Sequence, residues 1–281
     1  MDTQQTLPIR LVALDLDGTL FNEDKIIPPH TLDVLNQAIE QGVVVIPATG
    51  RPATGLPQSL MGLTGLRYAL TSNGAQVVEL ATNRSIIHFP IQPELAIRLV
   101  HILSRYDCLV SFFSGGDRIC FQGDLEHIPQ FLQANMVQYV QNTSTPVPDL
   151  AEHIRRTGVV VDKINAFFRD HEERRRAWQE LEALPDPVVV TSSLPLNMEV
   201  NAPDVTKGRA LMALAEHLGL APQQVMACGD SGNDLAMIQA AGLGVAMANA
   251  TPEVLAAADY VTLSNQEEGV ASAVEKFVLH R

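Results

Sequence analysis

The strongest constraint on the fold is a pattern that recurs near both ends of the chain, a short apolar run that stops in a polar turn containing glycine. Residues 11–14 (LVAL) lead into DLDGT, residues 43–46 (VVVI) lead into a turn with TGR, and residues 225–228 (VMAC) lead into GDSGND. A short apolar run closed by turn residues predicts a buried strand that feeds a loop. Three such strands, each ending in a polar turn, are therefore expected.

Helical segments separate these strands. Residues 31–41 place apolar side chains at helical spacing and stop at Gly42. The C-terminal part alternates in the same way, with helices expected over 206–219, 232–241, 252–258 and 266–278 and further strands over 243–247 and 259–263. Strand–helix–strand units of this length form parallel sheets. The sequence thus predicts an α/β domain.

The middle of the chain follows another pattern. Hairpin-like strands alternate there with longer helices, and the strands are expected over 108–113, 118–122, 158–161 and 164–168. Residues 141–148 are expected to form a loop, and residues 170–183 a charged helix. A chain of 281 residues has room for about two domains. We therefore expect a core of residues 1–84 and 191–281, interrupted by an inserted α+β domain over residues 85–190.

Composition excludes several classes of protein. Hydrophobic residues make up 46% of the chain, enough for a real core. The formal charge of −13, with no basic stripe, argues against a nucleic-acid or anionic-membrane partner. The N-terminal segment MDTQQTLPIR lacks the features of a signal peptide, and no apolar run reaches the roughly 18 residues of a membrane span. We expect a cytoplasmic protein whose three cysteines, Cys108, Cys120 and Cys228, are reduced.

The three polar turns, together with Lys207, bring the residue types of a phosphoryl-transfer site to one edge of the sheet. Ligands of open α/β sheets bind at the carboxyl ends of the strands, so the turns are expected to converge. Clustered carboxylates stay ionised only beside a cation, and oxygen ligands without His or Cys suit Mg²⁺. Thr49, Lys207 and Asn233 can donate hydrogen bonds to a phosphate, as can backbone N–H groups of the glycine-rich turns. Positioning and charge neutralisation supply most of the rate in such a site.

These turns resemble, in the same order, the four motifs of the haloacid dehalogenase-like hydrolase superfamily. The matching segments are Asp15-Leu16-Asp17-Gly18-Thr19-Leu20, Thr49-Gly50-Arg51, Lys207-Gly208 and Gly229-Asp230-Ser231-Gly232-Asn233-Asp234. The Ser72-Asn73-Gly74-Ala75 turn, Glu199 and the inserted segment are similar to those of the Cof-type phosphatases. The resemblance covers essentially the whole chain. It implies a Rossmann-like, doubly wound parallel-sheet core with an inserted α+β cap of the C2 type, which sets substrate specificity.

The resemblance also implies a role for each matching residue. Asp15 is expected to be the nucleophile that forms an aspartyl-phosphate, and Asp17 the general acid and then the general base. Mg²⁺ is expected to be bound by the Asp15 carboxylate, the Asp17 backbone carbonyl and Asp230. Phosphate is expected to contact Thr49, Gly50, Lys207, Asn233 and the Leu16 N–H. Asp234 is expected to orient Lys207 or a water bound to the metal. The implied substrates are small phosphorylated metabolites, such as sugar phosphates, pyridoxal phosphate or flavin mononucleotide.

Several interpretations stay open at this level. A phosphomutase of the same superfamily would use the same two aspartates, and release of free inorganic phosphate excludes it. A receiver domain also combines Asp, Thr, Lys and Mg²⁺, but it is much shorter and its phosphoaspartate persists. Thr49 can also cap a helix, and Arg51 can contact phosphate or form a structural ion pair. In the inserted segment, Lys163, Phe167 and Phe168 are interpreted as structural before functional.

Overall fold

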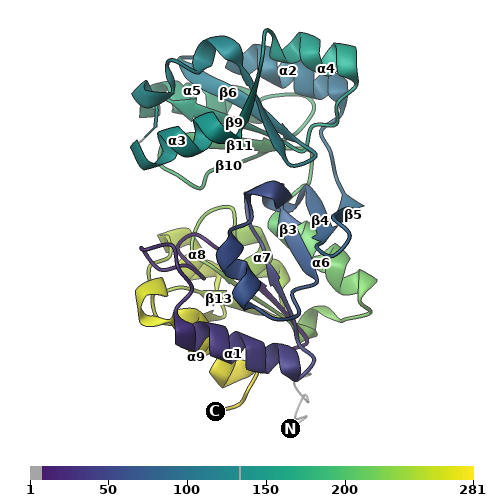
Figure 1. Ribbon diagram of the computed structural model, residues 1–281, viewed down its shortest axis with the longest axis vertical. Coiled ribbons are helices and arrows are strands. Elements are labelled where there is room, and N and C mark those ends of the chain that lie inside the picture. Colours follow the sequence, from purple (N-terminus) through teal and green to yellow (C-terminus); the bar gives the residue numbers. More distant parts are fainter. Residues whose placement is uncertain (1–7, 133) are drawn as a thin grey trace. The chain divides into compact units, whose positions relative to one another are not determined.

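The computed structural model describes residues 8–132 and 134–281, and the chain divides into two compact units (Figure 1). The first unit comprises Met1–Gly50, Leu56–His88 and Thr206–Arg281, and the second comprises Arg51–Gly55 and Phe89–Val205. Each unit has its own sheets and its own helices.

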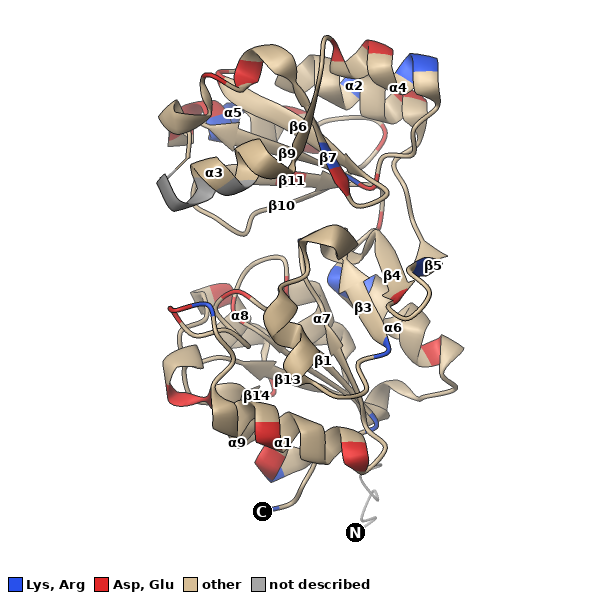
Figure 2. Ribbon diagram, in the orientation of Figure 1, with Lys and Arg blue, Asp and Glu red and all other residues tan. Residues whose placement is uncertain are grey.

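The first unit is built on a five-stranded parallel sheet with the strand order β14-β13-β12-β1-β2. Its strands are β1 (Leu11–Leu14), β2 (Val44–Pro47), β12 (Val225–Gly229), β13 (Leu243–Ala246) and β14 (Tyr260–Val261). None of these strands carries a charged residue (Figure 2). Alternate residues of β1 enter two different apolar clusters, Val12 and Leu14 in one and Leu11 and Ala13 in the other. The sheet is therefore buried on both faces, as parallel sheets are.

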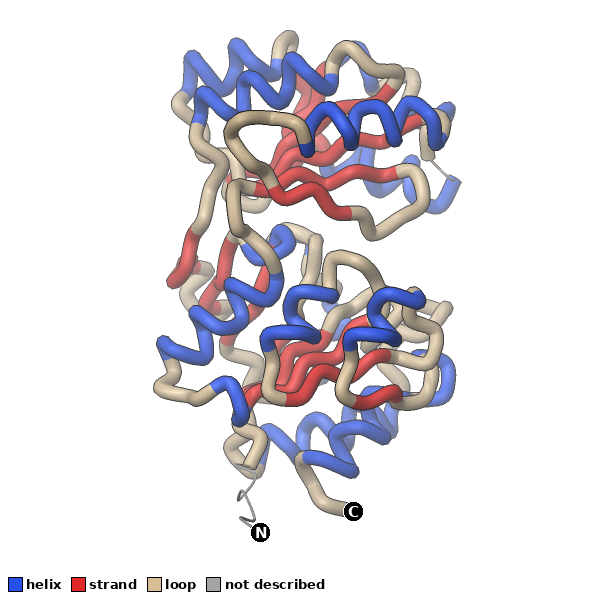
Figure 3. Tube along the Cα trace, turned by 180° about the vertical axis from the view of Figure 1, so that it is seen from behind, coloured by secondary structure: helices blue, strands red, loops and turns tan. Residues whose placement is uncertain are grey.

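Helices cover both faces of this sheet, which Figure 3 shows in red between blue helices. On one face α1 (Pro29–Glu40) packs against α9 (Gly269–Phe277), and on the other α6 (Lys207–His217) packs against α7 (Leu235–Ala240). A further helix, α8 (Pro252–Ala257), packs on α7 and β13. This arrangement confirms the predicted doubly wound, Rossmann-like α/β core.

A small antiparallel sheet extends the first unit beyond β2. It consists of β3 (Tyr68–Thr71), β4 (Gln76–Glu79) and β5 (Arg84–His88). A parallel bridge between Ala48 and Leu70 joins it to the chain after β2. Because β5 pairs with β4, the first unit continues to His88, four residues past the end expected from the sequence at residue 84.

The second unit is built on a six-stranded sheet with the strand order β10-β11-β9-β6-β7-β8. Its strands are β6 (Cys108–Ser114), β7 (Asp117–Phe121), β8 (Ser144–Val147), β9 (Lys163–Phe168), β10 (Val189–Thr191) and β11 (Asn197–Asn201). The chain also forms α2 (Pro93–Leu103), α3 (Ala134–Thr143), α4 (Leu150–Thr157) and α5 (His171–Glu182) here. Contacts of α2, α4 and α5 with the strands place these helices on one face of the sheet (Figure 1).

Three sequence-based boundaries differ from the structure in this unit. The core was expected to resume at residue 191, but β10 and β11 pair with each other and β11 pairs with β9, so residues 191–205 belong to the second unit. The expected loop 141–148 contains β8, which pairs in parallel with β7. The expected strand 158–161 forms only one bridge, from Val161 to Ile91. Apart from the β10–β11 hairpin, the pairing partners are distant in the sequence, and a local pattern does not reveal them.

The structure bears on two expectations from composition, the state of the cysteines and the absence of a membrane span. All three cysteines are free thiols, as predicted. None of the helices over residues 8–132 and 134–281 combines the length and the apolar character that crossing a bilayer requires.

Candidate active site

Neighbouring strands of the parallel sheet bring the polar turns to one edge. Asp15 directly follows β1, Asp230 directly follows β12, and Thr49 lies shortly after β2. Since β1 pairs in parallel with both β2 and β12, the carboxyl ends of these three strands are adjacent. This is the edge at which open α/β sheets bind their ligands.

A fully buried lysine joins two of the turns. Lys207 is the first residue of α6, whose N-cap Thr206 accepts a hydrogen bond from the Arg209 N–H at 3.1 Å. The Lys207 Nζ donates to Asp15 Oδ1 and to Asp234 Oδ1, each at 2.6 Å. Burial alone would lower the pKa of Lys207, but the two carboxylates outweigh it and raise that pKa above its ordinary value. Lys207 therefore stays charged and offsets the charge of both carboxylates.

Both oxygens of Asp234 are committed to contacts within the protein. While Oδ1 accepts from Lys207, Oδ2 accepts from the backbone N–H groups of Asp230 at 3.0 Å and Ser231 at 3.1 Å. The side chain is wholly buried. Asp234 thus fixes the turn after β12 and the position of the Lys207 ammonium.

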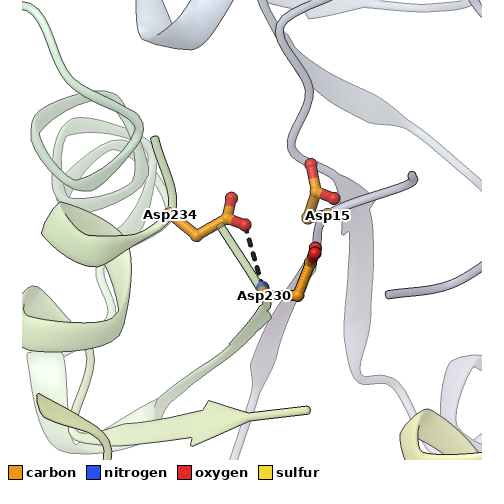
Figure 4. A group of neighbouring side chains, drawn as sticks. All are labelled: Asp15, Asp230 and Asp234. Carbon is orange, nitrogen blue, oxygen red and sulfur yellow. Dashed lines mark hydrogen bonds between the residues drawn. The ribbon is translucent and has the colours of Figure 1, made fainter. Parts of the chain in front are cut away.

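Asp15 and Asp230 each keep one less constrained oxygen. Carboxylate oxygens of Asp15, Asp230 and Asp234 lie within 4.8 Å of one another (Figure 4). Asp230 Oδ1 accepts a hydrogen bond from Thr19 Oγ1 at 3.0 Å, and Asp15 Oδ1 accepts from Lys207. The second oxygen of each, Oδ2, accepts no hydrogen bond from the described residues. These two oxygens are the ones available to a cation.

Burial makes this pair of carboxylates costly to ionise. Burial, followed by the charge of Asp234, raises the pKa of Asp15 well above its ordinary value despite the attraction of Lys207. The same two causes raise the pKa of Asp230 to about 6. A divalent cation would relieve the repulsion, and hard oxygen donors without His or Cys suit Mg²⁺. Residue 18 must be glycine for Asp230 to keep this position. Gly18 has φ +92°, and a Cβ there would lie 2.5 Å from Asp230 Oδ2.

The Asp17 carboxylate lies outside this cluster. Its Oδ1 accepts a hydrogen bond from Lys25 Nζ at 2.9 Å, and the two side chains are 41% and 62% exposed. The sequence assigned metal binding to the backbone carbonyl of Asp17 rather than to its side chain. An exposed carboxyl group at this position is accessible for exchanging a proton with a substrate or with water.

Two backbone groups expected to contact phosphate lie in the same turns. The Leu16 carbonyl accepts hydrogen bonds from the N–H groups of Thr19 and Phe21, while the Leu16 N–H donates to none of the described residues. Gly50 ends a segment of the first unit, and Arg51 begins a segment of the second. For Arg51, a contact with phosphate and a structural ion pair both stay predictions.

A residue that the sequence did not place in the site, Asn73, links the turns after β2 and β12. Its N–H donates to the Thr49 carbonyl at 3.1 Å, and its Oδ1 accepts from Asn233 Nδ2, also at 3.1 Å. Asn233 Oδ1 in turn accepts from Ser231 Oγ at 2.8 Å. Asn73 has a left-handed backbone, with φ 58°, which Asn tolerates better than most residues. The polar Ser-Asn-Gly stretch after the apolar run YALT was the available signal.

Comparisons with known proteins identify the family of this chain. The family model of the haloacid dehalogenase-like hydrolases matches residues 12–274. The chain is 31% identical to the 5-amino-6-(5-phospho-D-ribitylamino)uracil phosphatase YcsE of Bacillus subtilis, over 98% of each chain, and 30% identical to the phosphatase YwpJ of the same organism, over 94% of this chain and 98% of that one. A solved haloacid dehalogenase-like hydrolase from B. subtilis superposes with a TM-score of 0.83 at 27% identity, over 95% of this chain and 99% of the other. The chain therefore belongs to the haloacid dehalogenase-like hydrolases, among their Cof-type phosphatases.

Proposed function

We propose that this chain is a Mg²⁺-dependent phosphatase that hydrolyses small phosphomonoesters through a phosphoaspartate on Asp15. One observation carries the proposal: the buried Asp15 carboxylate at the end of β1 has one oxygen fixed by Lys207 at 2.6 Å and the other without a hydrogen bond from the described residues. A carboxylate held in this way is pre-oriented to attack phosphorus.

The proposed reaction has two halves, and Asp17 acts in both. In the first half an Asp15 oxygen bonds to phosphorus, the bond from phosphorus to the ester oxygen breaks, and Asp17 gives its proton to the leaving alcohol. In the second half Asp17 takes a proton from water, the water oxygen bonds to phosphorus, and the bond from phosphorus to Asp15 breaks. Inorganic phosphate leaves and the protein returns to its starting state. Splitting one difficult displacement into two easier ones is the advantage of a covalent intermediate.

Donors around Asp15 are proposed to hold the non-reacting phosphate oxygens. They are the Leu16 N–H, Thr49, Gly50, Lys207 and Asn233. Asn73 positions this set through its contacts with Thr49 and Asn233. Fixed donors of this kind stabilise the charge that develops on the transferring group.

Mg²⁺ fits the oxygen donors of this site. The carboxylates of Asp15 and Asp230 and the backbone carbonyl of Asp17 would hold it, and Asp234 would act through its contacts with Lys207 and the Asp230 turn. Bound there, the ion would offset negative charge on the phosphoryl group.

The second unit is proposed to act as the cap that selects the substrate. It contains none of the carboxylates of the site, and Asp15, Lys207, Asp230 and Asp234 all belong to the first unit. We expect substitutions in the second unit to change the preference among phosphomonoesters more than they change the chemical step.

The test of the proposed function is phosphate release from a panel of phosphorylated metabolites with Mg²⁺ present. Free inorganic phosphate in proportion to the alcohol released supports a phosphatase. Transfer of the phosphoryl group to another hydroxyl of the sugar, without free phosphate, would instead indicate a phosphomutase. A phosphorylated chain that never turns over would contradict both.

Mg²⁺ is expected to stabilise the chelator-treated protein more at about pH 7.5 than at about pH 5. The pKa of Asp230 is about 6 in the folded protein, above the ordinary value of 3.8. Between those values the metal-free folded state binds more protons than the unfolded chain, so its free energy of unfolding falls as the pH rises. Mg²⁺ needs ionised ligands and stabilises the folded state by binding to it, so the gain in Tm grows above about pH 6.

Thermal unfolding with and without Mg²⁺ at both pH values measures this effect, and Asp230→Asn is the control, since it should lose most of the response. Equal gains at both pH values would contradict the assignment of Asp230. Full phosphatase activity after exhaustive EDTA treatment would contradict Mg²⁺ dependence altogether.

Asn73→Ala is expected to raise KM for phosphomonoesters by about tenfold, because Asn233 loses its partner and the Thr49 turn becomes less fixed. Asn83→Ala is the matched control, because Asn83 has a similar left-handed φ of 51° but lies exposed in the turn between β4 and β5. Steady-state kinetics and Tm of both variants separate backbone strain from loss of the contact. The same change of KM in both variants would show that Asn73 has no part in the site.

A further inference from the structure

Two further turns lie at the edge of the parallel sheet that carries Asp15 and Asp230. Residues 247–251 follow β13, and residues 262–265 follow β14. Because β12, β13 and β14 pair in parallel, these turns begin at the same edge as the turn that holds Asp230. Both lie outside the four segments that match the family motifs.

An asparagine from each of these turns binds the backbone of the turn that carries Asp17. The Nδ2 of Asn249 donates to the carbonyl of Gly18, the residue after Asp17, at 2.9 Å. The Nδ2 of Asn265 donates to the Phe21 carbonyl at 2.8 Å. The turn is therefore held near both ends by amide side chains that lie 231 and 244 residues away from their partners.

The two asparagines also bind each other. The Oδ1 of Asn249 accepts a hydrogen bond from the Asn265 N–H at 3.0 Å. An asparagine side chain has an acceptor oxygen and a donor nitrogen, so both ends of the Asn249 amide are engaged. Since the oxygen accepts from the Asn265 N–H, the nitrogen is the atom that faces the Gly18 carbonyl.

The turn after β13 holds the turn of Asp230 as well. The Thr251 N–H donates to the Asp230 carbonyl at 2.8 Å, while Asn249 in the same turn binds the Gly18 carbonyl. Residues 247–251 therefore connect the two turns that are proposed to supply the Asp17 carbonyl and the Asp230 carboxylate to Mg²⁺.

The backbone at Asp17 needs such a restraint. Gly18 follows it directly, and glycine has the widest backbone freedom of the residue types. The Asp17 side chain is 41% exposed, so burial restrains it less than it restrains Asp15, which is 6% exposed. A hydrogen bond to the Gly18 carbonyl limits the rotation of the backbone immediately after Asp17.

We infer that Asn249 and Asn265 are positioning residues, which hold the Asp17 turn beside Asp230 so that both can bind one Mg²⁺. The inference rests on the proposed phosphatase function and its metal. Residues that orient metal ligands without touching the metal typically contribute about 10–100-fold in metal affinity or activity. The Thr19 hydroxyl, which donates to Asp230 Oδ1 at 3.0 Å, is a further link between the two turns, so the loss of one asparagine should be partial.

Asn36 of α1 is the matched control, because it makes the same pair of contacts elsewhere in the first unit. Its Nδ2 donates to the Gly62 carbonyl at 3.1 Å, and its Oδ1 accepts from the Thr64 N–H at 2.8 Å. Like Asn249, it ties a glycine carbonyl to a backbone N–H from another segment. Neither Gly62 nor Thr64 is among the residues proposed to bind Mg²⁺ or phosphate.

The test measures Mg²⁺ binding to the chelator-treated protein by isothermal titration calorimetry, which does not depend on turnover. The Kd for Mg²⁺ should rise about tenfold or more in Asn249→Ala and should stay at the wild-type value in Asn36→Ala. The Tm without Mg²⁺ should fall by similar amounts in these two variants, since each loses the same kind of contact. Asn265→Ala is the second variant, and it should raise the Kd as well. If Asn249→Ala does not fold, Asn265→Ala decides the inference.

A wild-type Kd in Asn249→Ala and Asn265→Ala would overturn the inference and leave both asparagines as structural residues. An equal rise of the Kd in Asn36→Ala would overturn it too, because any loss of stability would then weaken Mg²⁺ binding. If the wild-type protein binds no Mg²⁺, the proposed metal dependence fails together with the inference. If it binds Mg²⁺ but releases no phosphate from any ester, the proposed function fails alone, and the Kd values still decide the inference.

Discussion

Asp17→Asn should lower kcat for alkyl phosphates by about 10²–10⁴, the usual contribution of a positioned acid and base. Asparagine keeps the size of the side chain and the backbone carbonyl proposed for Mg²⁺, but it cannot transfer a proton. The fold should be unaffected, because Asp17 is 41% exposed and its Oδ1 accepts a hydrogen bond from the exposed Lys25. Steady-state kinetics together with Tm measure both effects. Wild-type turnover of alkyl phosphates by this variant would contradict the proposed mechanism.

The same variant should accumulate the covalent intermediate when the leaving group is good. An aryl phosphate needs little proton donation, so its first step should suffer less than its second, in which Asp17 must take a proton from water. Phosphoaspartate should then build up on Asp15 and appear as one added phosphate in intact-protein mass spectrometry. Asp15→Asn is the control and should show neither turnover nor the adduct. An adduct in Asp15→Asn would place the nucleophile elsewhere.

Lys207→Met should lower kcat/KM by about 10²–10³, in line with the loss of one transition-state donor. The structure adds a cost that the sequence did not indicate. Lys207 is fully buried between Asp15 and Asp234, at 2.6 Å from each, so its removal leaves two buried carboxylates without their cation. Breaking a buried ion pair in this way typically costs about 3–5 kcal/mol in the free energy of unfolding. Urea denaturation measures that cost.

The pH dependence of the free energy of unfolding and a second substitution test whether the charge of Lys207 accounts for this loss of stability. The pKa of Asp15 is raised already with Lys207 present, so without the lysine the folded state should hold its protons to still higher pH. The free energy of unfolding of Lys207→Met should therefore fall as the pH rises. Adding Asp234→Asn should recover part of the loss, because one unpaired charge is removed. Lys276→Met, at an exposed lysine of α9, is the matched control. A single variant as stable as the wild type would show that Lys207 does not compensate this charge.

The amino-acid sequence was sufficient to predict the strands that carry the site. The apolar runs of β1, β2 and β12 and the polar turns that follow them are local features, since hydrophobic period and glycine placement depend on neighbours in the chain. A parallel sheet then requires those turns to meet at one edge. The resemblance to the family motifs then suggested which residues at this edge carry the chemistry, above all Asp15 and Asp17.

The pairing of these groups follows from contacts between distant parts of the folded chain. Lys207 reaches Asp15 from 192 residues away, and Asn73 reaches Asn233 from 160 residues away. Burial of the lysine and the commitment of both Asp234 oxygens depend on such contacts. The placement of β10 and β11 in the second unit depends on strand pairing in the same way. The physical reason is that hydrogen-bond satisfaction and desolvation are properties of the space around an atom, and residues distant in the sequence fill that space.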